Sequence, residues 1–143
     1  MEYIDLGLSS GNLWASCNLG ANEFHEYGKY YNYHETLDLQ TNKGLLPSKE
    51  DWEELVNNCT WIWFPQKEIN GYIVIGPNNT SIFLPAAGSS NLSSAIIEED
   101  CYYWSFTNND NYTYYLYFCK HYYCVNKNGC GGKHPIRLIK KKK

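Results

Sequence analysis

Short runs of alternating apolar and polar residues, separated by turn-forming residues, constrain the fold of this chain more than any other feature. Gly11 separates the first two runs, and the segment 76–79, Gly-Pro-Asn-Asn, closes a later one. Alternation with a period of two indicates half-buried β-strands, and Gly, Pro and Asn supply the backbone conformations of turns. The sequence therefore predicts short strands joined by turns and loops.

We expect strands over 2–8, 12–18, 60–64, 71–75, 81–85, 102–106, 114–118 and 135–139, with a further short strand around 122–125. The segment 72–84 is typical of a hairpin. Loops are expected over 20–29, 86–100 and 107–111. The tyrosines at 30, 31 and 33 are expected to pack onto the core, and no internal repeat or linker divides the chain.

One segment predicts a helix. Ser48 is a good N-cap residue, and Asp51 follows three residues later, which nearly completes a capping box. An apolar stripe with helical spacing then follows, formed by Trp52, Leu55, Val56 and Cys59. The helix is expected to end at 57–58 and to bury this stripe, so Trp52 is interpreted as a core residue.

Charge and hydropathy exclude two classes of partner. The 143 residues carry a formal net charge of −3, and four of the 12 basic residues form the terminal run Lys140–Lys143, so the rest of the chain is acidic. This balance argues against a nucleic-acid-binding protein. No apolar run approaches the roughly 18 residues that cross a bilayer. We expect one domain over 1–139 and a disordered lysine tail over 140–143.

The N-terminal residues lack the basic start and apolar stretch of a signal peptide. We therefore expect a location in the cytoplasm or in a phage or surface assembly.

Six cysteines leave several interpretations open. Cys119, Cys124 and Cys130 with a nearby His offer zinc ligands, but their spacing matches no tight zinc knuckle. A Cys–His nucleophile pair has the right residue types, although nothing marks a base or an oxyanion hole. The favoured interpretation is that Cys17 and the cysteines at 59 and 101 are small buried hydrophobes, while the other three are thiols near the surface.

Several collinear segments together resemble a known family. They are 5–11, 13–15, 17–21, 27–31, 34–36, 46–55, 70–72, 82–88, 103–105, 115–118 and 136–137. In order and spacing, they are similar to the Fibrobacter succinogenes major paralogous domain family of Bacteroides-type bacteria and their phages. The family's final Val-Arg-Pro-Val-like strand is matched only in part, by 131–139.

This resemblance implies an α+β, C-type-lectin-like fold, related to formylglycine-generating enzymes. It implies a twisted antiparallel sheet with one clear helix, long loops and paired terminal strands. Similar domains are the variable proteins of diversity-generating retroelements, in which a fixed sheet displays substitutable side chains near the C-terminus. Asn, Asp, Tyr, His, Cys and Gly dominate 108–132, as expected when adenines of Asn codons are replaced. The alternative interpretation is a Tyr-rich β edge with no such variation.

The residues themselves also favour a binding surface near the C-terminus. Tyrosine accounts for 14 of the 143 residues, and it combines a rigid apolar ring with a polar tip, as binding surfaces require. Alternation in 114–119 assigns Tyr114, Leu116 and Phe118 to the core face. The expected ligand-binding residues are Asn108, Asn109, Asp110, Asn111, Tyr112, Lys120, His121, Tyr122, Tyr123, Asn126 and Asn128.

Among these residues, the tyrosines are the expected apolar anchors, and one of Tyr122 and Tyr123 is expected to pack inward because neighbours on a strand face opposite ways. We therefore expect a non-enzymatic module that binds a protein or glycan on a cell or phage surface, as in adhesion, without a cofactor. The alternative is a thiol- or metal-dependent enzyme related to formylglycine-generating enzymes. The acidic stretch 98–100 and the segment 108–111 are rich in oxygen ligands, but the motifs of calcium-dependent lectins are missing.

Overall fold

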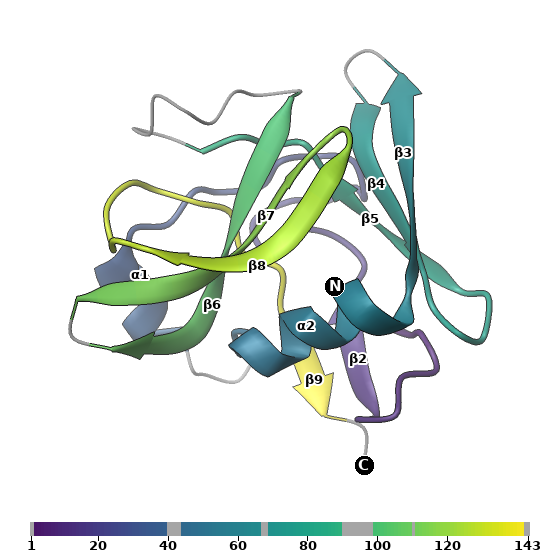
Figure 1. Ribbon diagram of the computed structural model, residues 1–143, viewed down its shortest axis with the longest axis horizontal. Coiled ribbons are helices and arrows are strands. Elements are labelled where there is room, and N and C mark those ends of the chain that lie inside the picture. The colour runs from purple at the N-terminus through teal and green to yellow at the C-terminus, as the bar shows by residue number, and fades with distance from the viewer. Residues whose placement is uncertain (1, 40–43, 67–68, 90–98, 110, 142–143) are drawn as a thin grey trace.

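The computed structural model describes residues 2–39, 44–66, 69–89, 99–109 and 111–141, and its arrangement is shown in Figure 1. Within these residues the chain forms three three-stranded antiparallel sheets and two helices. The helices are α1 (Tyr33–Leu37) and α2 (Lys49–Asn58). The chain is therefore mostly β, and the expected α+β, C-type-lectin-like fold with one clear helix is wrong.

The first sheet joins the two ends of the chain. Its strands are β1 (Tyr3–Asp5), β2 (Asn12–Ala15) and β9 (Ile139–Lys141), with β2 in the centre. The first and last strands therefore both pair with β2 and not with each other. Lys140 and Lys141 belong to β9, so the expected disordered tail is wrong at these two positions, and residues 142–143 lie outside the described part.

The second and third sheets follow the order of the chain. The second consists of β3 (Thr60–Gln66), β4 (Ile69–Ile75) and β5 (Ser81–Pro85), and the third of β6 (Asp100–Asn109), β7 (Tyr112–Cys119) and β8 (Tyr122–Asn128). The predicted range of β5 is confirmed, and the predicted hairpin is formed by β4 and β5. The expected loop at 107–111 is shorter, because β6 extends to Asn109.

Helix α2 has the cap that the sequence predicts. The Ser48 side chain accepts a hydrogen bond from the backbone N–H of Asp51 at 3.1 Å, and the Asp51 carboxylate accepts one from the backbone N–H of Ser48 at 2.9 Å. Trp52 and Leu55 are fully buried, and the Trp52 ring lies 4.7 Å from that of Trp14 in β2. Burying this stripe fixes α2 against the sheets.

Helix α1 was not predicted, although it has a complete capping box of its own. The Asn32 side chain accepts from the backbone N–H of Glu35 at 2.9 Å, and the Glu35 carboxylate accepts from that of Asn32 at 2.8 Å. The helix has only five residues, which is too few to show an apolar stripe.

A buried arginine connects the C-terminal segment to two sheets. The Arg137 guanidinium is fully buried and donates hydrogen bonds to Asn18 Oδ1 at 2.9 Å, to the carbonyl of Ala15 at 2.9 Å and to the carbonyl of Phe83 at 2.6 Å. Asn18 Oδ1 also accepts from the Tyr103 hydroxyl at 2.7 Å. These bonds satisfy a charge that would otherwise be costly to bury.

Candidate functional site

The strand register gives sheet β6–β7–β8 two distinct faces. Leu116 in β7 pairs with Tyr103 in β6 and with Val125 in β8, and these side chains point toward α2 and the core. The opposite face is called the outer face here. It carries alternate residues of the three strands: Tyr102, Trp104, Tyr115, Tyr117, Cys119, Tyr122, Cys124, Asn126 and Asn128.

Aromatic rings form a continuous row across the outer face. The ring centroids of Trp104 and Tyr115 are 5.2 Å apart, those of Tyr115 and Tyr102 5.8 Å, those of Tyr102 and Tyr117 4.7 Å, and those of Tyr117 and Tyr122 6.5 Å. The row begins at the fully buried Trp104 and ends at Tyr122, whose side chain is 56% exposed. Tyr122 is therefore held at the edge of a packed aromatic layer.

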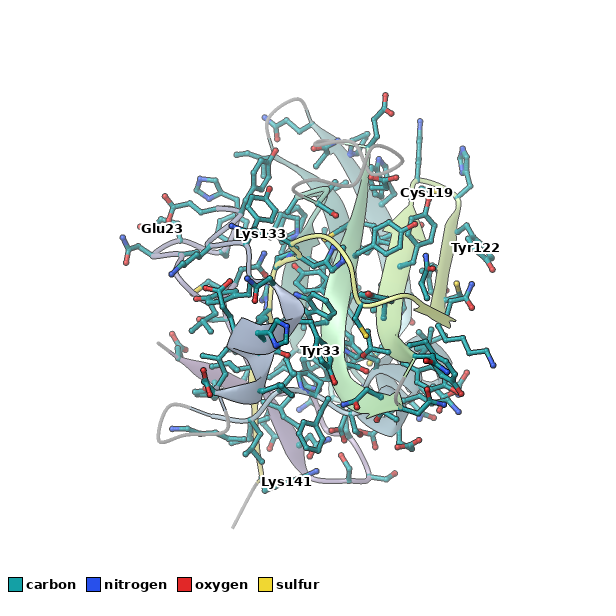
Figure 2. All side chains as sticks on the ribbon, turned by 90° about the vertical axis from the view of Figure 1, so that its left-hand side faces the viewer. Glu23, Tyr33, Cys119, Tyr122, Lys133 and Lys141 are labelled. Carbon is teal, nitrogen blue, oxygen red and sulfur yellow. The ribbon has the colours of Figure 1, made fainter. Side chains whose placement is uncertain are left out.

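The chain after β8 covers part of this face. Figure 2 looks onto it and shows the segment that carries Lys133 crossing in front of the strands, while Tyr122 stands free at the far edge. A cleft of about 330 Å³ lies beneath the crossing segment, lined by Tyr102, Tyr115, Asn128, Gly129, Gly131, Gly132 and His134. The Tyr115 hydroxyl donates a hydrogen bond to the Gly129 carbonyl and so ties the segment to the sheet.

His134 is the one imidazole among the described residues that line the cleft. It is buried, its Nδ1 lies 2.8 Å from Ser89 Oγ, and its Nε2 lies 3.2 Å from the Gly131 carbonyl. Burial lowers the pKa of His134 from 6.5 to about 4, so the imidazole is neutral near pH 7. The lining of the cleft thus includes a neutral polar ring that contacts the rings of Tyr102, Trp104 and Tyr115.

The structure separates the predicted binding residues into two groups. Asn108, Asn109, Asn111 and Tyr112 lie where β6 turns into β7, whereas Lys120 and His121 form the turn from β7 to β8. These two turns lie at opposite ends of β7, about 25 Å apart at the usual rise per residue. The predicted set is therefore not one compact site, and Asp110 lies outside the described residues.

The three proposed tyrosine anchors differ in their surroundings. Tyr123 faces inward, as one of the two neighbours was expected to, and stacks on Trp61 with ring centroids 4.4 Å apart and an interplanar angle of 5°. Tyr112 is half-buried, and the Lys127 ammonium lies 4.7 Å from its ring centroid. Of these three tyrosines Tyr122 is the most exposed, at 56%, whereas the rings of Tyr112 and Tyr123 are partly covered by these contacts.

The outer face combines Tyr122 with amide side chains. Asn126 and Asn128 are exposed and lie on the same face of β8 as Tyr122. Exposed amides supply both donors and acceptors of hydrogen bonds. Tyr115 lies on the outer face, opposite the β7 core positions, but it is only 3% exposed because the segment after β8 covers it.

A second cleft includes the turn residues Lys120 and His121. It measures about 450 Å³ and lies between that turn and sheet β3–β4–β5; its other lining residues are Trp63, Pro65, Asn70, Glu99 and Cys119. The contributions of β3 and β4 were not predicted, because no local pattern indicates that these strands approach the β7–β8 turn. The cleft makes Lys120 and His121 part of a different surface from Asn126 and Asn128.

All six cysteines are free thiols. Cys17 and Cys101 are buried as expected, whereas Cys59 is only half-buried. Burial raises the pKa of the Cys101 thiol, and it raises the pKa of Cys59 to about 11. In the described part of the chain, no three His, Cys, Asp or Glu side chains are grouped so that they could hold a metal ion.

Comparison of the chain with protein-family models, curated proteins and solved structures finds no match. The resemblance to the Fibrobacter succinogenes domain family therefore stays a prediction. Neither helix found in the described residues is long and apolar enough to cross a membrane.

Proposed function

We propose that this chain is a non-enzymatic recognition module that binds a protein or a glycan through the outer face of sheet β6–β7–β8. One observation carries the proposal. The aromatic row across this face begins at a fully buried ring and ends at Tyr122, whose side chain is 56% exposed. Its side chain is presented by a packed layer, so little conformational entropy is lost when a partner covers the ring.

The chemistry of the face suits both classes of ligand. Tyrosine is among the residues most often found as an interface anchor, because it buries apolar area and keeps one polar group. Asn126 and Asn128 add donors and acceptors along β8, about 20 Å from end to end. The cleft lined by Asn128 offers a concave subsite whose lining includes the neutral His134.

Binding to intact cells tests the proposal. Fluorescently labelled chain is incubated with a panel of bacterial cells, and bound fluorescence is measured by flow cytometry. We expect saturable binding to some cells, weakened about tenfold or more by Tyr122→Ala because an anchoring ring is lost. Protease treatment of the cells abolishes binding to a protein ligand, whereas mild periodate oxidation abolishes binding to a glycan.

The control is Ile62→Ala, which removes a large apolar side chain that is 48% exposed on β3, in a different sheet. It should leave cell binding unchanged. The proposal fails if no cell type binds the chain, or if Tyr122→Ala and Ile62→Ala bind as well as the unaltered chain. Stoichiometric copper or zinc in the purified protein would instead support the enzyme alternative.

A further inference from the structure

A separate cleft lies against the sheet β3–β4–β5, and this sheet is on the right in Figure 1. It measures about 490 Å³ and is lined by residues of four parts of the fold: Ile4, Ser16, Phe24, Phe64, Gln66, Ile69, Ile73, Ser81, Ile82 and Phe83. The strands β3, β4 and β5 form its floor, β1 and the residue after β2 form one wall, and the loop at 20–29 forms another. The cleft is therefore a concavity between separate elements, not a flat sheet face.

Three phenylalanines define the aromatic part of this cleft. The Phe24 ring lies 5.7 Å from the Phe83 ring at 80°, and the Phe64 ring lies 6.3 Å from Phe83 at 89°. These edge-to-face contacts fix Phe83, which is buried, as a hub between the other two rings. Phe24 is 50% exposed, so half of its surface still faces solvent and can be covered by a ligand.

The polarity of the lining indicates the chemical class of the ligand. None of the described residues that line the cleft carries a charge, so a charged ligand would lose hydration without gaining a partner. Ser16, Ser81 and Gln66 supply hydroxyl and amide groups that can orient one polar substituent. Volume, apolar lining and a few polar groups are together typical of small-molecule sites, which span roughly 300–1,000 Å³.

We propose that this cleft binds an uncharged, mainly apolar small molecule with an aromatic or aliphatic body and one hydrogen-bonding group. The site is distinct from the outer face of β6–β7–β8. It does not depend on the recognition function proposed above, because the two sites share no residue.

Titration with N-phenyl-1-naphthylamine, a neutral apolar dye that fluoresces in apolar surroundings, tests the proposal on the full chain. We expect one saturable site per chain. Phe24→Ser should weaken binding about tenfold, because it removes a ring that the dye would cover. Ser81→Trp should abolish binding, because the indole occupies the cleft from the exposed start of β5.

Two controls separate this site from others. Ile62→Ser removes an equally exposed apolar side chain of β3 that does not line the cleft, and Tyr122→Ala alters the outer face. Both should bind the dye with unchanged affinity. Circular dichroism establishes that each variant is folded, and if Ser81→Trp is not, Phe24→Ser alone decides the outcome.

Two results would overturn the proposal. One is that the unaltered chain binds no dye, or that Phe24→Ser and Ile62→Ser bind it with equal affinity. The other is that the chain sediments as a dimer, that Phe24→Ser dissociates this dimer, and that the monomer binds no dye. That result would assign the cleft to contact with a second copy of the chain.

Discussion

Truncation to Ala should lower the free energy of unfolding strongly at Tyr123 but hardly at its neighbour Tyr122 in β8, and the structure gives the size of the difference. Tyr123 is half-buried, stacks on Trp61 at 4.4 Å and contacts Tyr72 with ring centroids 5.3 Å apart. Truncating a fully buried aromatic residue to Ala costs about 3–5 kcal/mol, and a half-buried ring costs about half of that. Loss of the stacked pair adds about 0.5–1.5 kcal/mol. Tyr123→Ala should therefore lower the free energy of unfolding by about 2–4 kcal/mol.

Tyr122→Ala is the matched control, because the two residues are adjacent on one strand. Tyr122 is 56% exposed, and surface substitutions of this kind change stability by about 0.5 kcal/mol or less. Urea unfolding followed by tryptophan fluorescence measures both variants. With a slope of about 2 kcal/mol/M, the urea midpoint of Tyr123→Ala should fall by about 1–2 M, while that of Tyr122→Ala hardly moves. Equal destabilisation, or a larger effect at Tyr122, would refute the assignment of Tyr123 to the scaffold and Tyr122 to the displayed face.

Four further predictions concern His134, Cys101, Arg137 and Lys141. The imidazole of His134 is protonated near pH 6.5 in the unfolded chain and near pH 4 in the folded chain. The free energy of unfolding therefore has its full value above pH 6.5 and falls by about 3 kcal/mol as the pH drops to 4. His134→Gln should remove this part of the pH dependence, measured by urea unfolding. Maleimide labelling followed by mass spectrometry should leave Cys101 unmodified until the chain unfolds, because its thiol is fully buried and burial raises its pKa. Arg137→Met should lower the free energy of unfolding by about 3 kcal/mol or more, because three buried acceptors lose their charged donor. Lys141→Ala should cost only about 1 kcal/mol, because the Lys141 side chain is 58% exposed, although its ammonium donates to Asn12 Oδ1 at 2.7 Å and lies 3.6 Å from Asp51 Oδ1.

Each of these predictions has a result that would contradict it. A pH profile of stability that is identical in His134→Gln and the unaltered chain would show that another group titrates. Labelling of Cys101 at the rate of an exposed thiol in the folded chain would contradict its burial. Equal losses in Arg137→Met and Lys141→Ala would show that the buried hydrogen-bond network adds nothing beyond a surface contact.

Local patterns in the sequence were sufficient for part of the fold. Helix α2 was predicted because Ser48 and Asp51 form its cap and Trp52 begins its buried stripe, all within a few residues. The hairpin of β4 and β5 was predicted because a turn directly joins two alternating runs. Each of these features depends on interactions between residues close together in the chain.

Other parts depend on contacts that no local pattern contains. Alternation along β7 places Tyr115 on the face opposite Leu116, but it does not indicate that the segment after β8 crosses this face and buries the ring. Lys140 and Lys141 have the composition of a disordered tail, yet pairing with β2 makes them a strand. The predicted binding residues are also divided by the fold. Lys120 and Asn128 are close in sequence, but they lie at opposite ends of β8.

Hydroxyl-radical footprinting of the chain, free and bound to cells, tests the central claim most directly. In the free chain, mass spectrometry should find Tyr122 strongly oxidised. On bound chain, Tyr122 should be protected while Ile62 in β3 is oxidised to the same extent in both states. Unchanged oxidation of Tyr122 on binding, or a Tyr122 already protected in the free chain, would contradict the account.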